Sequence, residues 1–310
     1  MEILKNPSFD FLGKARFFII LSLLVILAGI GLMARPGGLR YGVEFSGGTQ
    51  LIVKFQKPPQ IDKVRNAVER DAPGAVIQTY DAPARNQVLI RLAEQPADTE
   101  LTAPAQRVIE ALAESYKENP VVESSSEIVG PIVGAELRRK AIQLTALGLL
   151  FQLVYIAIRF KGAIWGAAAT IACFHDVLVC LTCLALFRYE ITLNVIAALL
   201  TLVGYSVNDT IVIFDRAREN LRQKRKEPLT KLLNDSLNQT LTRTLISNGT
   251  TFLAVLGLYL FGGEVLKGFG FTMVVGILVG TYSTIYIASP IVIWWQRVSQ
   301  KQPAAAKAAL

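Results

Sequence analysis

Six long apolar stretches constrain the fold of this chain more than any other feature of its sequence. They cover residues 17–33, 141–158, 163–187, 191–214, 244–263 and 268–295. The hydrocarbon core of a bilayer is about 30 Å thick, and a helix crosses it with roughly 20 mostly apolar residues. The chain is 52% hydrophobic and only 18% charged, a composition typical of integral membrane proteins. We therefore predict six transmembrane helices.

The first stretch has the apolar character of a signal peptide. However, Arg35 and Pro36 follow it, rather than a clear cleavage site of small residues. Five further spans also require an uncleaved start. We therefore expect residues 17–34 to remain as the first transmembrane helix.

The distribution of lysine and arginine predicts the orientation of these helices. With residues 1–16 in the cytoplasm, 16 of the 32 basic residues face inward, and the short outer loops hold only Arg188 and Lys267. The other 14 lie in residues 35–140 beside 14 acids, with 138–140 as a local conflict next to the second span. We expect a cytoplasmic loop at about 216–243 within the helical part, 141–296, and a cytoplasmic tail at 297–310.

The net charge of +8 comes from this basic inner face. Such a face is typical of a topology signal and of contact with anionic membrane lipids. No aromatic residues interleave with the basic residues of 216–231, so we expect no nucleic-acid binding.

The sequence offers little for catalysis or for a cofactor. It has one histidine, and its three cysteines, Cys173, Cys180 and Cys183, fall in one apolar stretch, where core thiols are the simplest interpretation. It has neither a phosphate-binding glycine-lysine loop nor a serine nucleophile elbow. We expect no metal, no cofactor and no enzymatic activity.

Residues 35–140 return to a soluble composition. Strand-like alternation at 49–55, 75–80, 87–92 and 121–129, with helical spacing at 60–72 and 101–116, gives the order β-α-β-β-α-β. This order predicts a small α+β domain of ferredoxin-like type outside the membrane.

Two glycine-bearing segments flank this domain. One contains Phe45, Gly47 and Gly48, and the other runs from Gly130 and Pro131 to Gly134. The simplest interpretation is a turn into the first strand and a connection into the second span. The alternative is that both segments transmit movement between the domain and the membrane.

Ionisable residues inside the predicted spans are the candidate functional residues. A charge near the bilayer centre costs about 2.5–3.5 kcal/mol, so each one indicates a function. Asp209, beside Asn208, falls late in the fourth span, and Arg243 opens the fifth. Thr201, Tyr205 and Asp209 share one helix face, as do Arg243, Ser247 and Thr251.

Two facing polar stripes indicate a proton path, in which a carboxylate changes charge and an arginine stays charged. The structural alternative is that Arg243 reaches the interface and Asp209 bonds to Asn208 and nearby hydroxyls. For the pair His175 and Asp176 in the third span, a proton step and a local hydrogen bond remain equally open.

Glycine pairs at 162/166 and 276/280 have the small-x-x-x-small spacing that lets helices approach closely. We expect tight helix packing at both places.

Several segments together resemble the shorter, SecF-type members of the SecD/SecF family of bacterial protein-export membrane proteins. They are residues 42–49, 129–134, 174–176, 204–212, 215–220 and 242–244. One departure is Glu44, where the family usually has aspartate. The resemblance implies that Asp209 and Arg243 take part in proton transport.

The resemblance also implies a bundle that is half of a resistance-nodulation-division transport unit. The implied partners are SecD, the SecYEG channel, the SecA motor and an exported polypeptide, at the bacterial cytoplasmic membrane. Two alternatives remain: a small-molecule or lipid exporter subunit of that superfamily, and a scaffold of the export channel that moves no protons.

Overall fold

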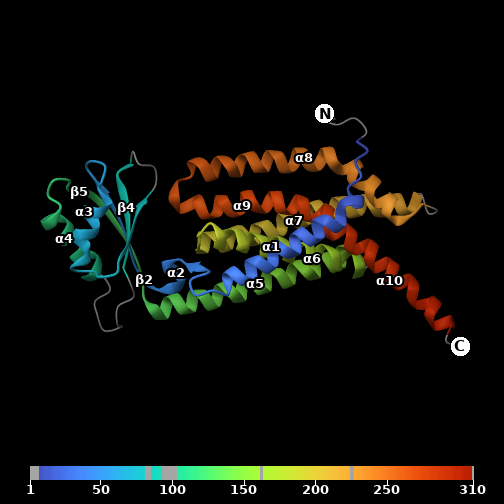
Figure 1. The fold of residues 1–310 in the computed structure, drawn as a ribbon, viewed down its shortest axis with the longest axis horizontal. Coiled ribbons are helices and arrows are strands. Elements are labelled where there is room, and N and C mark those ends of the chain that lie inside the picture. Colours follow the sequence, from blue (N-terminus) through green and yellow to red (C-terminus); the bar gives the residue numbers. More distant parts are fainter. Residues whose placement is uncertain (1–6, 81–84, 93–102, 161–162, 224–226, 309–310) are drawn as a thin grey trace.

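The computed structural model describes residues 7–80, 85–92, 103–160, 163–223 and 227–308. It consists of a long helical bundle with a small α/β domain at one end (Figure 1). We refer to the end of the bundle beside this domain as the domain-proximal end.

The bundle is formed by long helices that follow the predicted apolar stretches. They are η1 (Leu12–Lys14), α1 (Ala15–Met33), α5 (Pro131–Phe160), α6 (Ala163–Leu186), α7 (Leu193–Gln223), α8 (Leu229–Phe261), α9 (Gly263–Ser283), the π-helical turn η3 (Thr284–Ala288) and α10 (Ser289–Ala308). Within the described residues, five segments are long and apolar enough to cross a membrane: Leu12–Met33, Ile164–Leu186, Leu193–Gln223, Leu229–Phe261 and Val265–Val298. These match five of the six predicted spans.

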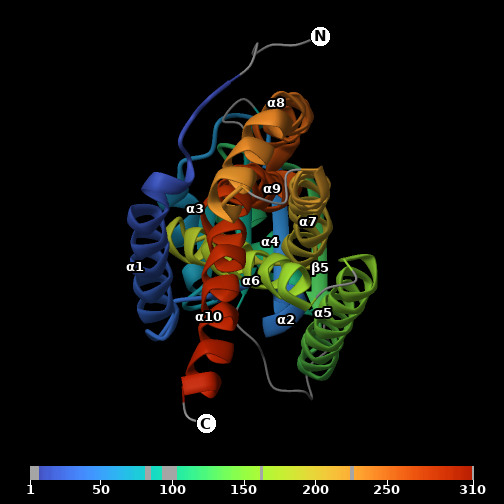
Figure 2. The same ribbon diagram turned by 90° about the vertical axis from the view of Figure 1, so that its right-hand side faces the viewer.

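Helix α5 contains the remaining predicted span, residues 141–158. It lies on the outside of the bundle (Figure 2) and exposes large apolar side chains, with Ile142 and Phe151 each 65% exposed and Ile158 71%. An apolar surface of this kind marks a face that meets lipid or a partner rather than water.

Helix α6 is the central helix, because α1, α5, α7 and α9 all pack against it (Figure 2). Small residues make this possible: Ala168, Ala169 and Ala172 are buried in the core of the bundle. Between α7 and α9, a side chain at Gly276 would meet Leu202 at 2.5 Å and one at Gly280 would meet Ser206 at 3.2 Å. Close packing at the 276/280 pair is therefore confirmed. In the other pair Gly166 is buried, and residue 162 lies outside the described residues.

The segment expected as a cytoplasmic loop, at about 216–243, is mostly helical. Helix α7 continues to Gln223, and α8 already begins at Leu229. Hydropathy marks where a helix leaves the apolar layer, but charged residues such as arginine and glutamate extend a helix readily beyond it.

The α/β domain has the predicted order of elements. Strand β2 (Gly48–Phe55) is followed by α3 (Ile61–Glu69), β3 (Val76–Tyr80), β4 (Gln87–Leu92), α4 (Ala103–Ser115) and β5 (Val121–Val129). The strands form an antiparallel sheet in the order β3-β4-β2-β5. Leu51, Val53 and Phe55 alternate into the core beneath α3 and α4, so the other face of the sheet turns toward the bundle.

Two short elements join the domain to the bundle. Strand β1 (Arg40–Tyr41) pairs in parallel with β6 (Glu190–Ile191), which lies between α6 and α7. The short helix α2 (Val43–Ser46) then leads into β2. The segment after α1 is thereby fixed to the domain-proximal end of the bundle.

The close contact of α7 with α9 predicts that Gly276→Leu destabilises the bundle. The new side chain would overlap Leu202, and overpacking of this kind costs about 1–3 kcal/mol. The melting temperature of the purified full chain in detergent, followed by tryptophan fluorescence, should fall. Gly257→Leu is the control, because no atom lies within 4 Å of a Cβ there. An equal fall in both variants would contradict the packing argument.

Candidate functional site

The first candidate site lies around Asp209 on α7. Its side chain is buried, with 6% exposed, and Asn248 of α8 donates to its Oδ2 at 2.5 Å. The same amide nitrogen donates to Thr281 of α9 at 2.6 Å, and Tyr205 donates to the Asn248 oxygen at 2.9 Å. An uncharged amide therefore holds this carboxylate between α7, α8 and α9.

Arg243 of α8 acts on Asp209 through its charge, from a distance. It is exposed, and within the described residues no ion pair joins it to Asp209. The face of α8 turned inward contains Ser236, Thr240, Thr244 and Asn248, all buried. The predicted stripe of Arg243, Ser247 and Thr251 was therefore one residue out of phase, although Tyr205 does reach the Ser247 carbonyl at 3.3 Å.

The sequence contains a signal for the correct face. Ser236, Thr240, Thr244 and Asn248 recur every four residues, which is the spacing of one helix face. The predicted partner Asn208 is exposed, and the donor to Asp209 comes from α8 instead.

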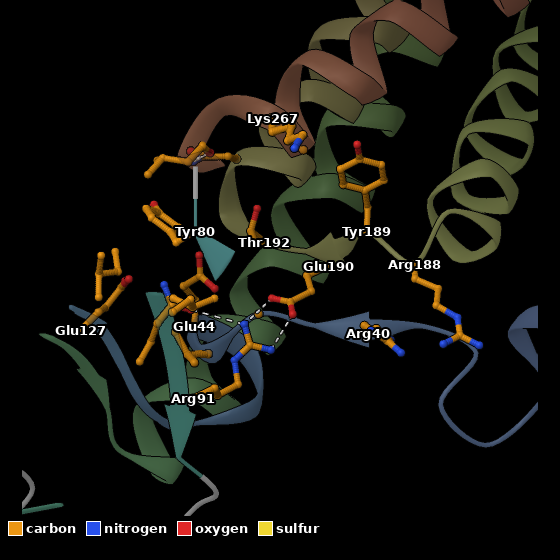
Figure 3. Close-up of a pocket in the computed structure, with 18 of the residues that line it drawn as sticks. Arg40, Glu44, Tyr80, Arg91, Glu127, Arg188, Tyr189, Glu190, Thr192 and Lys267 are labelled. Atoms are coloured by element: carbon orange, nitrogen blue, oxygen red, sulfur yellow. Dashed lines mark hydrogen bonds and ion pairs between the residues drawn. The ribbon is translucent and has the colours of Figure 1, made fainter. Parts of the chain in front are cut away.

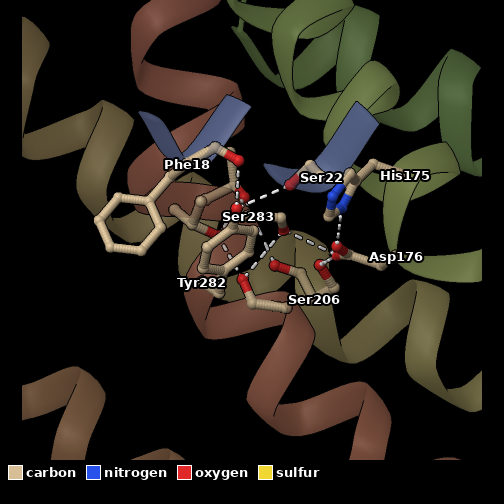
Figure 4. A network of polar contacts seen from close by, with 10 residues as sticks. Phe18, Ser22, His175, Asp176, Ser206, Tyr282 and Ser283 are labelled. Carbon is tan, nitrogen blue, oxygen red and sulfur yellow. Dashed lines mark hydrogen bonds and ion pairs between the residues drawn. The ribbon is translucent and has the colours of Figure 1, made fainter. Parts of the chain in front are cut away.

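The second candidate site is a network around His175 and Asp176 on α6 (Figure 4). Asp176 is fully buried, and His175 is 6% exposed. The His175 Nδ1 lies 3.0 Å from Asp176 Oδ1. Ser206 of α7 and Ser283 of α9 donate to Oδ2 at 2.5 and 2.9 Å. The structure thus brings His175 and Asp176 together with two hydroxyls that the sequence did not single out.

Tyr282 extends this network to α1. Its ring stacks on the His175 imidazole, with centroids 6.0 Å apart. Its hydroxyl donates to the Phe18 carbonyl at 2.6 Å and lies 2.7 Å from the Ser22 hydroxyl. Since the phenol has one proton, Ser22 is the donor to Tyr282.

The two candidate sites meet at the junction of α9 with the π-helical turn η3. Thr281 belongs to the Asp209 site, Ser283 belongs to the Asp176 site, and Thr284 lies 2.9 Å from Thr210 of α7. Such π-helical turns occur frequently at functional sites. Both sites therefore include residues at the same turn of helix.

The first glycine segment is a turn next to Phe45, whose side chain is buried in the bundle. Gly47 and Gly48 have φ values of 75° and 114°, which side chains rarely tolerate, so the predicted turn into the first strand is confirmed. Phe45 is buried among α6, α7 and α9 side chains. A Cβ at Gly134 would lie 3.1 Å from the Gly47 nitrogen.

The second glycine segment is the junction of β5 with α5. Gly130 alone separates Val129 from Pro131, the first residue of the helix, where proline is favoured. Because Gly134 touches Gly47, both glycine segments meet at one place between domain and bundle.

A polar cleft of about 340 Å³ separates the bare face of the sheet from the bundle (Figure 3). Across it, Arg91 of β4 donates to both carboxylate oxygens of Glu190, at 2.6 and 2.5 Å. Arg91 also donates to Gln50 at 3.3 Å. Sequence reasoning missed this pair, since 99 residues separate its members.

Glu44 lies in the same cleft. Burial raises the pKa of its carboxyl, and the nearby charges of Glu127 and Glu190 act in the same direction. The ionised form of this carboxyl is therefore disfavoured in the folded chain relative to water.

Comparison with protein families identifies the chain. A model described as "Protein export membrane protein SecD/SecF, C-terminal" matches residues 108–298, and one described as "SecD/SecF GG Motif" matches residues 37–59. The chain belongs to the SecD/SecF family. The GG motif of this family coincides with the turn at Gly47 and Gly48.

Curated relatives in the SecD/SecF family carry the name protein translocase subunit SecF. The protein of Calditerrivibrio nitroreducens is 42% identical over 94% of this chain and 96% of its own. That of Escherichia coli O157:H7 is 37% identical over 91% of this chain and 86% of its own. With several apolar helices as well, the chain is a multi-pass membrane protein.

Solved structures give the same family. The SecDF of Thermus thermophilus, described as a translocon-associated membrane protein, matches with a TM-score of 0.81 and 35% identity. A SecDF in a super-membrane-facing form matches with a TM-score of 0.72 and 36% identity. The chain spans 39% and 41% of these two SecDF chains.

The position of Glu44 predicts that Glu44→Gln stabilises the chain at neutral pH. With a folded-state pKa above the ordinary 4.5, this group contributes stability that is present below pH 4.5 and lost as pH rises through the raised pKa. The melting temperature of the variant should exceed that of the wild type at neutral pH and equal it in acid.

The control is Glu136→Gln, because Lys140 lies 2.7 Å from Glu136 and lowers the pKa of that exposed carboxyl. No gain is expected from this variant. A gain for Glu44→Gln that persists in acid would contradict the burial argument.

Proposed function

We propose that this chain is the SecF-type subunit of a SecD–SecF complex that assists translocation of polypeptides across the bacterial cytoplasmic membrane. Proton flow into the cell drives movement of the α/β domain outside the membrane. The names of the relatives support the role in translocation, and the buried Asp209 supports the coupling to protons.

The proposed topology has six spans, with α5 as the second. Both termini are cytoplasmic, and residues 35–140 are periplasmic. The exposed apolar face of α5 and the excess of basic residues at the opposite end support this topology. The strand order β3-β4-β2-β5 with helices on one face supports a ferredoxin-like assignment of the domain.

The buried Asp209 carboxylate carries this proposal. A charged carboxylate deep among apolar helices is unfavourable, so protonation and release can change the packing around it. Asn248 connects that change to α8 and α9. Arg243 stays charged throughout, and His175, Asp176 and Asn208 remain predicted members of the proton relay.

The movement reaches the α/β domain through the contacts at the domain-proximal end. Phe45 is inserted among α6, α7 and α9, while Gly47 abuts Gly134 at the start of α5. The Arg91–Glu190 pair connects the sheet to the segment between α6 and α7. Helix rearrangement at Asp209 would therefore tilt the domain.

The exposed helix faces support assembly with SecD, which would supply the other half of a transport unit. The SecYEG channel, the SecA motor and the exported polypeptide complete the proposed set of partners. The chain performs no enzymatic reaction of its own in this scheme.

The proposal predicts that Asp209→Asn abolishes proton-coupled export without preventing assembly. Asparagine keeps the shape of the side chain but cannot release a proton. Export of a secreted reporter would be measured with and without an uncoupler, in cells whose only copy carries the variant. The uncoupler-sensitive part of export should be lost, while co-purification with SecD is retained.

Asp235→Asn on α8 is the matched control and should export normally. If Asp209→Asn exports like the wild type, the acid is structural and the chain is a scaffold that moves no protons. If export is normal but an apolar compound accumulates in the cells, the small-molecule or lipid exporter gains support.

The Arg91–Glu190 pair predicts a second effect, at the junction of domain and bundle. Arg91→Glu would place two carboxylates face to face and remove charged hydrogen bonds, which are worth about 1.5–3 kcal/mol. Hydrogen exchange in β4 and β6 of the full chain should accelerate. The double variant Arg91→Glu with Glu190→Arg should restore part of the protection.

The control reverses the charge of one member of an exposed ion pair in the same sheet. Lys54 and Glu123 lie 3.4 Å apart and are 43% and 70% exposed, so Lys54→Glu should change exchange little. Equal acceleration in both single variants, or no recovery in the double variant, would argue against a specific connection at Arg91.

A further inference from the structure

The buried imidazole of His175 has one nitrogen without a partner. Its Nδ1 faces Asp176, but its Nε2 is buried and makes no hydrogen bond to any described residue. Buried polar atoms are nearly always paired, so an unpaired one needs a specific explanation.

The surroundings of Asp176 are built for a charged carboxylate. Three donors surround it: His175 Nδ1 at one oxygen and the Ser206 and Ser283 hydroxyls at the other. If Nδ1 carries the proton that it donates, the unpaired Nε2 is the nitrogen that is free to accept another. Proton binding there would turn a net charge of −1 into a neutral imidazolium–carboxylate pair.

We propose that His175 and Asp176 form a second, one-proton site in the membrane, separate from Asp209, which binds and releases its proton at the imidazole Nε2. This inference rests on the proposed function, because it adds a second proton-binding site to the same proton-coupled complex. The proton forms one N–H bond, and no other bond changes.

Other ionisable groups surround the pair from the helices packed against α6. Helix α7 contributes Asp209, one turn beyond Ser206, and α9 contributes the Tyr282 phenol with Tyr286 of η3 beside it. Helix α6 itself contributes the thiols of Cys173 and Cys180. The charged side chains described on α1, α5 and α10 are all exposed: Arg16, Glu136, Arg138, Arg139, Lys140, Arg159 and Arg297. Among the described residues, no lysine or arginine pairs with Asp176.

Tyr282 connects this site to helix α1. Its ring lies over the imidazole, and its hydroxyl is fixed to α1 through Phe18 and Ser22. A cation forming beneath the ring changes this stacking contact. The second site thus acts on the contact between α9 and α1, whereas Asp209 acts on the contact between α7, α8 and α9.

The single histidine makes the proposal directly measurable. Full chain labelled with ¹⁵N-histidine and placed in lipid nanodiscs gives nitrogen signals from one imidazole. We expect a proton on Nδ1 alone at alkaline pH and protons on both nitrogens at acid pH. An imidazole that never changes, or that carries its single proton on Nε2, would overturn the proposal.

Two variants test whether this site is separate from Asp209. Asp209→Asn should leave the histidine titration in place, and loss of the titration would show that there is one site rather than two. Asp176→Asn removes the carboxylate that pairs with the imidazolium, so the nitrogen signals of the doubly protonated imidazole should weaken at a given acid pH. Asp235→Asn is the control and should change nothing.

A functional test uses His175→Asn. The asparagine amide can still donate to Asp176 in place of Nδ1, but it offers no nitrogen that titrates. We expect normal co-purification with SecD and loss of most uncoupler-sensitive export; unchanged export would overturn the role of the site. If His175→Asn has no effect on export, the proposal for Asp209 still stands. If Asp209→Asn has no effect on export, the titration of His175 can still be observed. The failure of one proposal is therefore distinguishable from the failure of the other.

Discussion

Satisfying two carboxylates inside an apolar bundle is the requirement on which the rest of this structure depends. Asp176 and Asp209 are the acids that the described bundle buries, and each unpaired charge in such a place costs several kcal/mol. Uncharged donors satisfy both: the Ser206 and Ser283 hydroxyls at one, with His175, and the Asn248 amide at the other. These hydrogen bonds set the relative positions of α6, α7, α8 and α9. If a helix moved by one turn, its donor would no longer reach the carboxylate, and the buried carboxylate would lose that hydrogen bond.

The same arrangement makes α9 the helix that contacts both sites. Thr281 and Ser283 touch the two sites from neighbouring positions, and the π-helical turn follows at once. Close contact with α7 is possible only because Gly276 and Gly280 lack side chains. A helix held by polar bonds on two sides, next to a turn of different pitch, is suited to move between two packed positions.

Attachment of the α/β domain to the bundle rests on contacts of a different kind. Phe45 is held by apolar packing, Gly47 and Gly134 by the close approach of two backbones, and Arg91 with Glu190 by a paired charge. These contacts lie around a polar cleft rather than a continuous core. The domain is therefore attached to the bundle by separate contacts, each of a different chemical kind.

Hydropathy and periodicity were sufficient to predict much of this protein. The spans, the β-α-β-β-α-β order and the presence of ionisable residues in the spans depend on local pattern, which the sequence states directly. A helix turns about 100° per residue, so an error of one position in the phase of α8 put Ser247 rather than Asn248 on the face expected to meet Asp209. The sequence by itself determined which segments are apolar enough to cross a membrane and which acids lie within them. Only the tertiary structure decided which donors meet those acids, that Arg91 reaches Glu190, and that the His175 Nε2 is left unpaired, because such contacts join helices and strands that are far apart along the chain.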